Sequence, residues 1–385
     1  MRARLGAGRA GKKGGTEQAL DELASIEIGH GGRLLVGALP VIFRAVTTDF
    51  LFAWHPLAPR VWLVEGNGAN SVVIADGRDV LLVDTKETGF GGALRREVER
   101  VAGRPVTCVV STHHHTDHAM GNVAFTADVP VIAQRRARDR TIARATRAIV
   151  EMATAAERGD DVFEAHVADL HDWALYYGHV RLDDGTRAEY QALMEQGCEA
   201  LRGVSGVAER IAAVASLAER FAPTETFEAE HALRVGAIEV ELRYLGPGHT
   251  DNDVVVVVPS ERVVIAADLV YVGLQPFIDV GAGARTDEWL RRTDELLELC
   301  DRLKRDDRAV LVVPGHGMAA GAEAVVRQRS YFERLREAAH QTIQSGGTRA
   351  DAVRLVPPGL PTERAALLGI NLGIAFDELD QGRVG

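Results

Sequence analysis

The sequence predicts an α/β layered domain, and three observations indicate this class. Between residues 55 and 134, short runs rich in Val, Ile and Leu alternate with turn signals and one stretch of helical spacing. Residues 135–222 contain few such runs and are rich in Ala, Arg and Glu. Strand-like runs return between residues 223 and 320, with helix-like sequence between and after them. Groups of strands with helices between and after them are typical of layered α/β folds.

The first group of predicted strands contains one turn signal and one helix. We expect strands within residues 60–66, 70–85, 105–112 and 129–134. The Asp-Gly pair at positions 76 and 77 divides the second of these segments into two strands joined by a turn. A helix is expected over residues 91–103, because Leu94, Val98 and Val101 recur on one helical face.

The middle of the chain is expected to be helical, and strands are expected again after it. Helical spacing relates Val204, Val207, Ile211, Val214 and Phe221. Strands are then expected in residues 237–246, 253–260, 262–270 and 308–315, with a helix over 286–303. We therefore predict a disordered tail over residues 1–20, the first half of the domain over 21–134, a helical insertion over 135–222, the second half of the domain over 223–320 and a C-terminal helical extension over 321–385.

The composition argues against several classes of protein. The 385-residue chain has a formal net charge of −11, which disfavours nucleic acid as a partner because phosphate binding needs a concentrated basic surface. The Arg-rich run over residues 134–147 is interpreted as a solvated helix face. Cys108, Cys198 and Cys300 lack CxxC spacing and indicate neither a disulfide framework nor a thiolate metal site.

The chain also lacks the sequence signals of a membrane protein. No apolar run approaches the roughly 20 residues that span a bilayer, and no signal peptide is evident. We therefore expect a cytoplasmic protein that has no membrane contact and acts on a small-molecule substrate. The sequence does not predict an oligomeric state.

Residues able to bind metal ions end or follow five apolar strands. These residues are Asp84, then His113, His115, Asp117 and His118, then His249, Asp268 and His316. Because ligands in α/β sheets collect at one end of the strands, these side chains are expected to converge. Imidazole and carboxylate groups without thiolate suit Zn²⁺, Fe or Mn²⁺.

The spacing within the histidine cluster suggests two ions side by side. In an extended chain, residues two apart point the same way, so His113 and His115 can bind one ion while His114 points away. A turn would then allow Asp117 and His118 to face a second ion.

The motif THHHTDH, residues 112–118, resembles the HxHxDH signature of the metallo-β-lactamase superfamily. The later stretches GPGHTDND, AAD and PGHG resemble the remaining metal-binding motifs of that family, in the family's order. The resemblance covers residues 55–320 without the segment 135–222. It implies an αββα four-layer sandwich, in which two mixed sheets pack face to face with helices outside, here with a helical insertion and C-terminal helices.

The same resemblance implies a set of metal ligands. One metal would be bound by His113, His115 and His249, the other by Asp117, His118 and His316, and Asp268 would bridge both. Asp84 would orient a ligating imidazole. Thr250 is a further candidate for a supporting role, unless its hydroxyl bonds nearby backbone instead.

This ligand set would support hydrolysis. Two cations about 3.5–4 Å apart lower the pKa of a bridging water, so hydroxide becomes available near neutral pH to attack a carbonyl or phosphoryl centre. Asp117 is the candidate catalytic residue, because a carboxylate there can orient the hydroxide and shuttle a proton. We expect a dinuclear metal-dependent hydrolase with two Zn²⁺, or with Fe or Mn, that acts on a small ester, lactone, thioester or amide.

Other activities stay open at this point. They are a diiron oxidoreductase on the same fold, a β-lactamase-like amide hydrolase and, disfavoured by the acidic charge, a nuclease. Asp268 stands where one lactamase group has a cysteine ligand, and Tyr271 where those lactamases often have a carboxylate-binding lysine, which disfavours antibiotic hydrolysis. Substrate contacts are expected from the insertion and from residues 271–284, with Tyr271, Gln275 and Phe277 as candidates.

Overall fold

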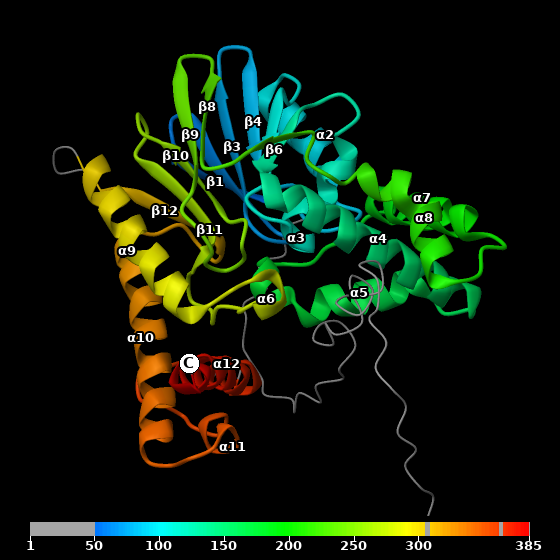
Figure 1. Cartoon of the computed structure of the whole chain (residues 1–385). Coiled ribbons are helices and arrows are strands. Elements are labelled where there is room, and N and C mark those ends of the chain that lie inside the picture. Colours follow the sequence, from blue (N-terminus) through cyan, green and yellow to red (C-terminus); the bar gives the residue numbers. More distant parts are fainter. Residues whose placement is uncertain (1–50, 305–308, 362–364, 385) are drawn as a thin grey trace, which may run out of the picture. The chain divides into compact units, whose positions relative to one another are not determined.

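The computed structural model describes residues 51–304, 309–361 and 365–384, which form two β-sheets with helices around them (Figure 1). The predicted disordered tail, residues 1–20, lies outside the described residues. Within the described ranges, no helix is both long enough and apolar enough to cross a membrane.

The first sheet has seven strands that follow one another in chain order. They are β1 (Ala53–Ala58), β2 (Val61–Glu65), β3 (Ser71–Asp76), β4 (Asp79–Val83), β5 (Cys108–Val110), β6 (Val131–Gln134) and β7 (Glu225–Phe227). Strands β1 to β4 are antiparallel neighbours, whereas β4 to β7 run parallel. Gly77 has a φ of 58° in the turn between β3 and β4, so the Asp-Gly signal marks a hairpin, as predicted.

The second sheet has five strands. In sheet order they are β12 (Leu311–His316), β11 (Val263–Tyr271), β10 (Val254–Val258), β9 (Ile238–Tyr244) and β8 (Glu230–Val235). Only the β11–β12 pair is parallel. The sequence did not predict strands β1, β7 and β8.

The valine strand β10 shows how the layers are built, because all five of its residues are buried. The core between the sheets contains Val254, Val256 and Val258 of β10 together with Leu63 and Leu81 of the first sheet. Val255 and Val257 point to the opposite face, where they share a core with helices α9 (Thr286–Leu303) and α10 (Glu323–Gln344). A strand buried on both faces reads as a continuous apolar run, which is why the sequence revealed it.

Helix α2 (Gly91–Ala102) covers the outer face of the first sheet. Its Leu94 and Val98 lie in one apolar cluster with Leu82 of β4. With α9 and α10 outside the second sheet, the layers are helix, sheet, sheet and helix (Figure 1). The predicted αββα sandwich is confirmed.

The remaining helices lie between β6 and β7 and at the end of the chain. The first group is α4 (Arg135–Glu157), α5 (Val162–Asp172), α6 (Ala174–Tyr177), α7 (Asp184–Leu201) and α8 (Val207–Glu219). After β12 follow α10, α11 (Arg349–Ala352) and α12 (Ala365–Val384). Helices α4, α7 and α8 share an apolar cluster of their own. The domain boundaries drawn from the sequence stay predictions, because the element order does not fix them.

Candidate metal centre

Loops and strand ends of both sheets carry the predicted ligands. Asp84 directly follows β4, His113 and His115 lie between β5 and the short helix α3 (Thr116–Ala119), and Asp117 and His118 lie in α3 itself. His249 follows β9, and His316 is the last residue of β12. Asp268 lies inside β11 and not at its end, next to Ala267, whose φ of 46° accompanies an irregular register with β12.

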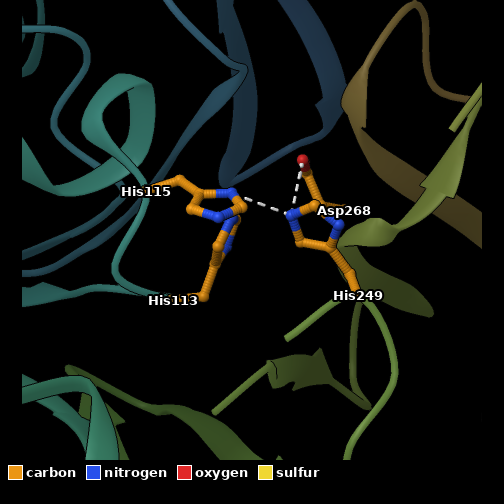
Figure 2. Close-up of side chains that lie close together, drawn as sticks. All are labelled: His113, His115, His249 and Asp268. Atoms are coloured by element: carbon orange, nitrogen blue, oxygen red, sulfur yellow. Dashed lines mark hydrogen bonds and ion pairs between the residues drawn. The ribbon is translucent and has the colours of Figure 1, made fainter. Parts of the chain in front are cut away.

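The structure brings the seven predicted ligand residues into two adjacent groups. His113, His115, His249 and Asp268 form one group, and Asp117, His118 and His316 form the other. Within each group the potential ligand atoms lie within 4.8 Å of one another. Figure 2 shows the rings of His115 and His249 facing each other in the first group, with the Asp268 carboxylate beside His249.

Asp268 lies between the two groups. Its Oδ2 is 3.3 Å from Nε2 of His249 and 3.5 Å from Nε2 of His316. Its Oδ1 is 3.1 Å from Nε2 of His118. One carboxylate therefore faces both groups, which is the placement that a bridging ligand requires; the bridging role itself stays a prediction.

Each of the five imidazoles has its outer nitrogen next to an oxygen. The pairs are His113 Nδ1 with Thr112 Oγ1 (3.1 Å), His115 Nε2 with Asp279 Oδ2 (2.8 Å), His118 Nδ1 with Asp84 Oδ2 (2.7 Å), His249 Nδ1 with the Phe277 carbonyl (2.9 Å) and His316 Nδ1 with the Tyr176 carbonyl (2.9 Å). Carbonyl and carboxylate oxygens only accept, and the Thr112 hydroxyl already donates to Asp84. In each neutral ring the outer nitrogen is therefore the donor, and the inner nitrogen carries a lone pair.

The inner atoms fit a cation. The buried atoms His113 Nε2, His118 Nε2 and Asp268 Oδ1 have no hydrogen-bond partner among the described residues. His115 Nδ1 and His249 Nε2 lie 2.9 Å apart, although both are acceptors in the arrangement above. Buried polar atoms without partners are costly, and converging lone pairs repel. A metal ion coordinated by these atoms would remove both costs, so the donor set fits the metal that the sequence predicted.

The electrostatics of the two groups differ. Burial lowers the pKa of His113 well below its usual range and that of His115 to about 4, so both rings are neutral. Burial also acts on His118 and His316, but nearby carboxylates, above all Asp268, outweigh it and raise both pKa values, that of His316 to about 9. Without metal, the second group therefore attracts protons, and a cation would displace them.

The family model of the metallo-beta-lactamase superfamily matches residues 64–316, well over half of the chain. The chain belongs to the metallo-beta-lactamase superfamily.

Solved structures with similar folds include lactamases of the superfamily. A metallo-beta-lactamase from Pontibacter korlensis has 16% identity and a TM-score of 0.47, with 73% of this chain and 99% of that chain covered. DIM-1 metallo-beta-lactamase has 16% identity and a TM-score of 0.46, with 73% and 97% covered. TMB-1 has 15% identity and a TM-score of 0.46, again with 73% and 97% covered. No curated protein matches the chain.

Two carboxylates accept hydrogen bonds from imidazoles of the predicted ligand set, and the sequence analysis named one of them. Asp84 accepts hydrogen bonds from the Thr112 backbone, the Thr112 hydroxyl and His118, and its expected role in orienting a ligand stays a prediction. Asp279 accepts a hydrogen bond from His115 and was missed. The sequence showed only that Asp279 is a carboxylate in a Gly-containing loop. The spacing of residues within a loop does not predict which other residues the loop will contact.

The alternation argument for the histidine cluster was wrong. Strand β5 ends at Val110, and residues 112–114 form bends, so the chain is not extended there. His114 is buried, and its Nδ1 accepts from the Asn252 amide at 3.1 Å. His113 and His115 nevertheless reach the same group, because the bends and not an extended strand turn them inward.

The remaining candidates do not all face the centre. Thr250 donates its hydroxyl to Asp253, so it holds the loop after His249 and has no described contact with a ligand. Tyr271 donates to the Asp268 carboxylate and stacks on the His316 ring, with 5.3 Å between centroids. This buried tyrosine packs beside the ligands.

Two of the candidates for substrate contact, Gln275 and Phe277, have different surroundings in the structure. Gln275 is 3% exposed and its amide donates to the Pro361 carbonyl, so it is directed toward the C-terminal helices and not toward the metal centre. Phe277 is half-buried, and its ring lies 6.2 Å from that of His115. Of the two, only Phe277 has a position from which it can contact a substrate.

Proposed function

We propose that the chain is a hydrolase with two metal ions that acts on a small ester, lactone, thioester or amide. The observation that carries this proposal is the inward convergence of lone pairs from five imidazoles and two carboxylates. Metal ions at this position would supply Lewis acidity and a nucleophile at neutral pH. Zinc is proposed because the donors are nitrogen and oxygen only, a set that Zn²⁺ accepts.

The chain's own residues would position the reactants. His113, His115 and His249 would hold one ion, Asp117, His118 and His316 the other, and Asp268 both. Asp117 is half-buried, and the imidazoles of His118 and His316 hold its pKa below the usual range against the effect of burial. We propose that this carboxylate orients the attacking water and accepts its proton.

The proposed reaction adds the oxygen of water to the acyl carbon and breaks the bond to the leaving oxygen, sulfur or nitrogen. The proton taken up at the Asp117 carboxylate passes to the leaving group. The half-buried ring of Trp173 lies 6.2 Å from that of Phe277, and we propose that the two rings limit the access of water on this side.

The test combines metal analysis with an activity panel. We expect about two equivalents of zinc per chain after zinc reconstitution, and hydrolysis of at least one member of a panel of 4-nitrophenyl esters, lactones, thioesters and β-lactams. His115→Ala should lower metal content and rate together, whereas His340→Ala, on the exposed side of α10, should change neither. Stoichiometric iron with oxygen consumption and no hydrolysis would favour the diiron alternative and overturn the proposal.

A further inference from the structure

Helix α4 carries the Arg-rich run that the sequence analysis interpreted as a solvated face. Arg136, Arg140 and Arg144 are spaced by four residues and so share one side of the helix. Arg136 donates to the Tyr244 hydroxyl at 2.8 Å, and Arg140 binds both oxygens of Asp251 at 2.6 and 2.7 Å. This side of α4 is therefore anchored on the loop that follows β9 and is not a freely solvated face.

Arg144, the third residue of the row, differs from the other two. Its Nη2 forms an ion pair with Oδ2 of Asp279 at 3.7 Å, which is too long for a hydrogen bond, and it donates no hydrogen bond to any residue that the structure describes. The hydrogen bonds of Asp279 come from other donors, since Oδ2 accepts from His115 and Oδ1 from the Ala282 amide at 3.0 Å. The Arg144 side chain is 31% exposed, so its five N–H donors are available to another acceptor.

The Arg144 guanidinium lies beside the candidate metal centre. Contacts of 3.7 and 2.8 Å connect it through Asp279 to the ring of His115. Burial lowers its pKa, and the carboxylates of Asp279, Asp117 and Glu87 oppose that shift. His115 belongs to one ligand group and Asp117 to the other, so a permanently charged cation is placed near both.

An apolar surface adjoins the same histidine. The Phe277 ring is 6.2 Å from the ring of His115, and the Trp173 ring is 6.2 Å from that of Phe277. Both aromatic side chains are half-buried, so part of each remains accessible. Beside His115 there is thus a cation on Arg144 and an accessible apolar surface.

We propose that Arg144 binds an oxyanion on the substrate, so that the preferred substrates are small acyl compounds with a carboxylate-type group at the far end of a short apolar chain. The inference rests on the proposed hydrolase function and specifies its substrate class. A guanidinium is suited to this task because its planar fork matches the two oxygens of a carboxylate. Arg144 would thus determine specificity without taking part in bond cleavage.

The first test compares two esters that differ only in the anion. 4-Nitrophenyl pentanoate and mono-4-nitrophenyl glutarate have the same leaving group, and the glutarate carries a carboxylate where the pentanoate ends in a methyl group. We expect the zinc-loaded protein to favour the glutarate in kcat/KM by roughly 10- to 100-fold, the range of a hydrogen-bonded charge pair. Arg144→Gln should remove this preference mainly through KM, and Arg144→Lys should restore part of it. Arg147→Gln, which changes the same charge on the same helix beside Glu151, should keep it.

The second test measures binding without hydrolysis. 5-Oxohexanoate and 2-hexanone differ by the same carboxylate and contain no bond to hydrolyse, so calorimetric titration of the zinc-loaded protein reports recognition alone. We expect Arg144→Gln to weaken the binding of 5-oxohexanoate by roughly tenfold or more and to leave the affinity for 2-hexanone unchanged. Equal loss for both compounds, or no loss for either, overturns the role of Arg144. If no ester is hydrolysed but the difference in binding persists, the hydrolase proposal fails while the anion site stands.

Discussion

At the scale of single residues, the area next to the metal centre contains charged groups that are unusual for a buried position. Lys86 is fully buried, and its ammonium donates to the carbonyls of Val64 and Ala69 at 2.7 Å each. Glu87 is 6% exposed and accepts from the Thr88 backbone and the Tyr177 hydroxyl. The two neighbours therefore face different partners and do not neutralise each other.

Glu87 gives a prediction for the pH dependence of stability. Burial, with Asp117 nearby, raises its pKa from 4.5 to about 7. Between these two pKa values, Glu87 keeps its proton in the folded state but releases it in the unfolded chain. The free energy of unfolding therefore falls as the pH rises from 4.5 to 7, and above pH 7 the full loss remains. Glu87→Gln removes the charge, and we expect it to raise the free energy of unfolding of metal-free protein at pH 8 by about 1–3 kcal/mol, with little effect near pH 4.5.

Urea denaturation at both pH values checks this expectation. Glu151→Gln, which changes an exposed carboxylate in a surface pair with Arg147, should show no such pH-dependent gain. A gain of the same size at both pH values would mean that the charge of Glu87 is not the cause.

At the scale of elements, a close backbone approach holds the histidine cluster in place. Gly121 belongs to the 3₁₀ helix η1 (Met120–Ala124), and a Cβ there would lie 1.9 Å from the Thr85 carbonyl and 3.0 Å from Gly91 Cα. The Thr85 backbone in turn donates to the His118 carbonyl at 2.7 Å. The loop after β4, the start of α2 and η1 therefore meet directly beside a candidate ligand.

Gly121→Ala should disturb this contact. Because the obstructing atoms are backbone, the chain must shift, and we expect a loss of about 1–3 kcal/mol in stability together with weaker metal binding through His118. Gly185→Ala is the matched control, since its nearest neighbour is a side-chain oxygen of Asp183 at 3.3 Å and its position in α7 favours Ala. Calorimetric unfolding and chelator competition measure the two effects. An unchanged metal affinity in Gly121→Ala would show that this backbone contact does not influence metal binding.

The elements also show which parts of the fold the sequence could reveal. Buried strands such as β10, with five valines, are evident from composition alone. Strand β8 has mostly exposed residues and lies at a sheet edge, and β7 has only three residues, so neither carries an apolar pattern. Strand β1 contains Pro56, which argues against a strand in a sequence and is tolerated here at an edge.

The candidate site was predictable to a similar extent. The convergence of the seven predicted ligand residues could be inferred because strand ends meet at one edge of a sheet, whatever the loops between them do. The position of Asp279 could not be inferred, because it depends on the loop after β11, which is held by contacts with helices distant in the sequence. The role of Arg144 was hidden for the same reason, because an Arg-rich helix has the same sequence pattern whether it faces solvent or a site.

At the scale of the whole molecule, the C-terminal helices contact the loop that accepts hydrogen bonds from two of the predicted ligands, His115 and His249. Asn371 of α12 is fully buried, and its amide donates to the Pro276 carbonyl at 2.9 Å and to the Tyr331 hydroxyl at 2.8 Å. Phe277, which follows Pro276, has the carbonyl that accepts a hydrogen bond from His249. Helix α12 is therefore connected to the candidate metal centre through the backbone of two adjacent residues, Pro276 and Phe277.

This connection predicts that a change far along the chain alters metal binding. Asn371→Leu removes both donated hydrogen bonds and leaves the Pro276 carbonyl buried without a partner, at a cost of about 1–3 kcal/mol. The freed loop should hold His249 less firmly, so metal affinity measured by chelator competition should fall by several-fold. Arg349→Ala, which breaks an exposed pair with Asp377 between α11 and α12, should leave metal affinity unchanged. A destabilised Asn371→Leu protein with wild-type metal affinity would show that the helices support the fold alone, and that the loop keeps its ligand-orienting geometry without them.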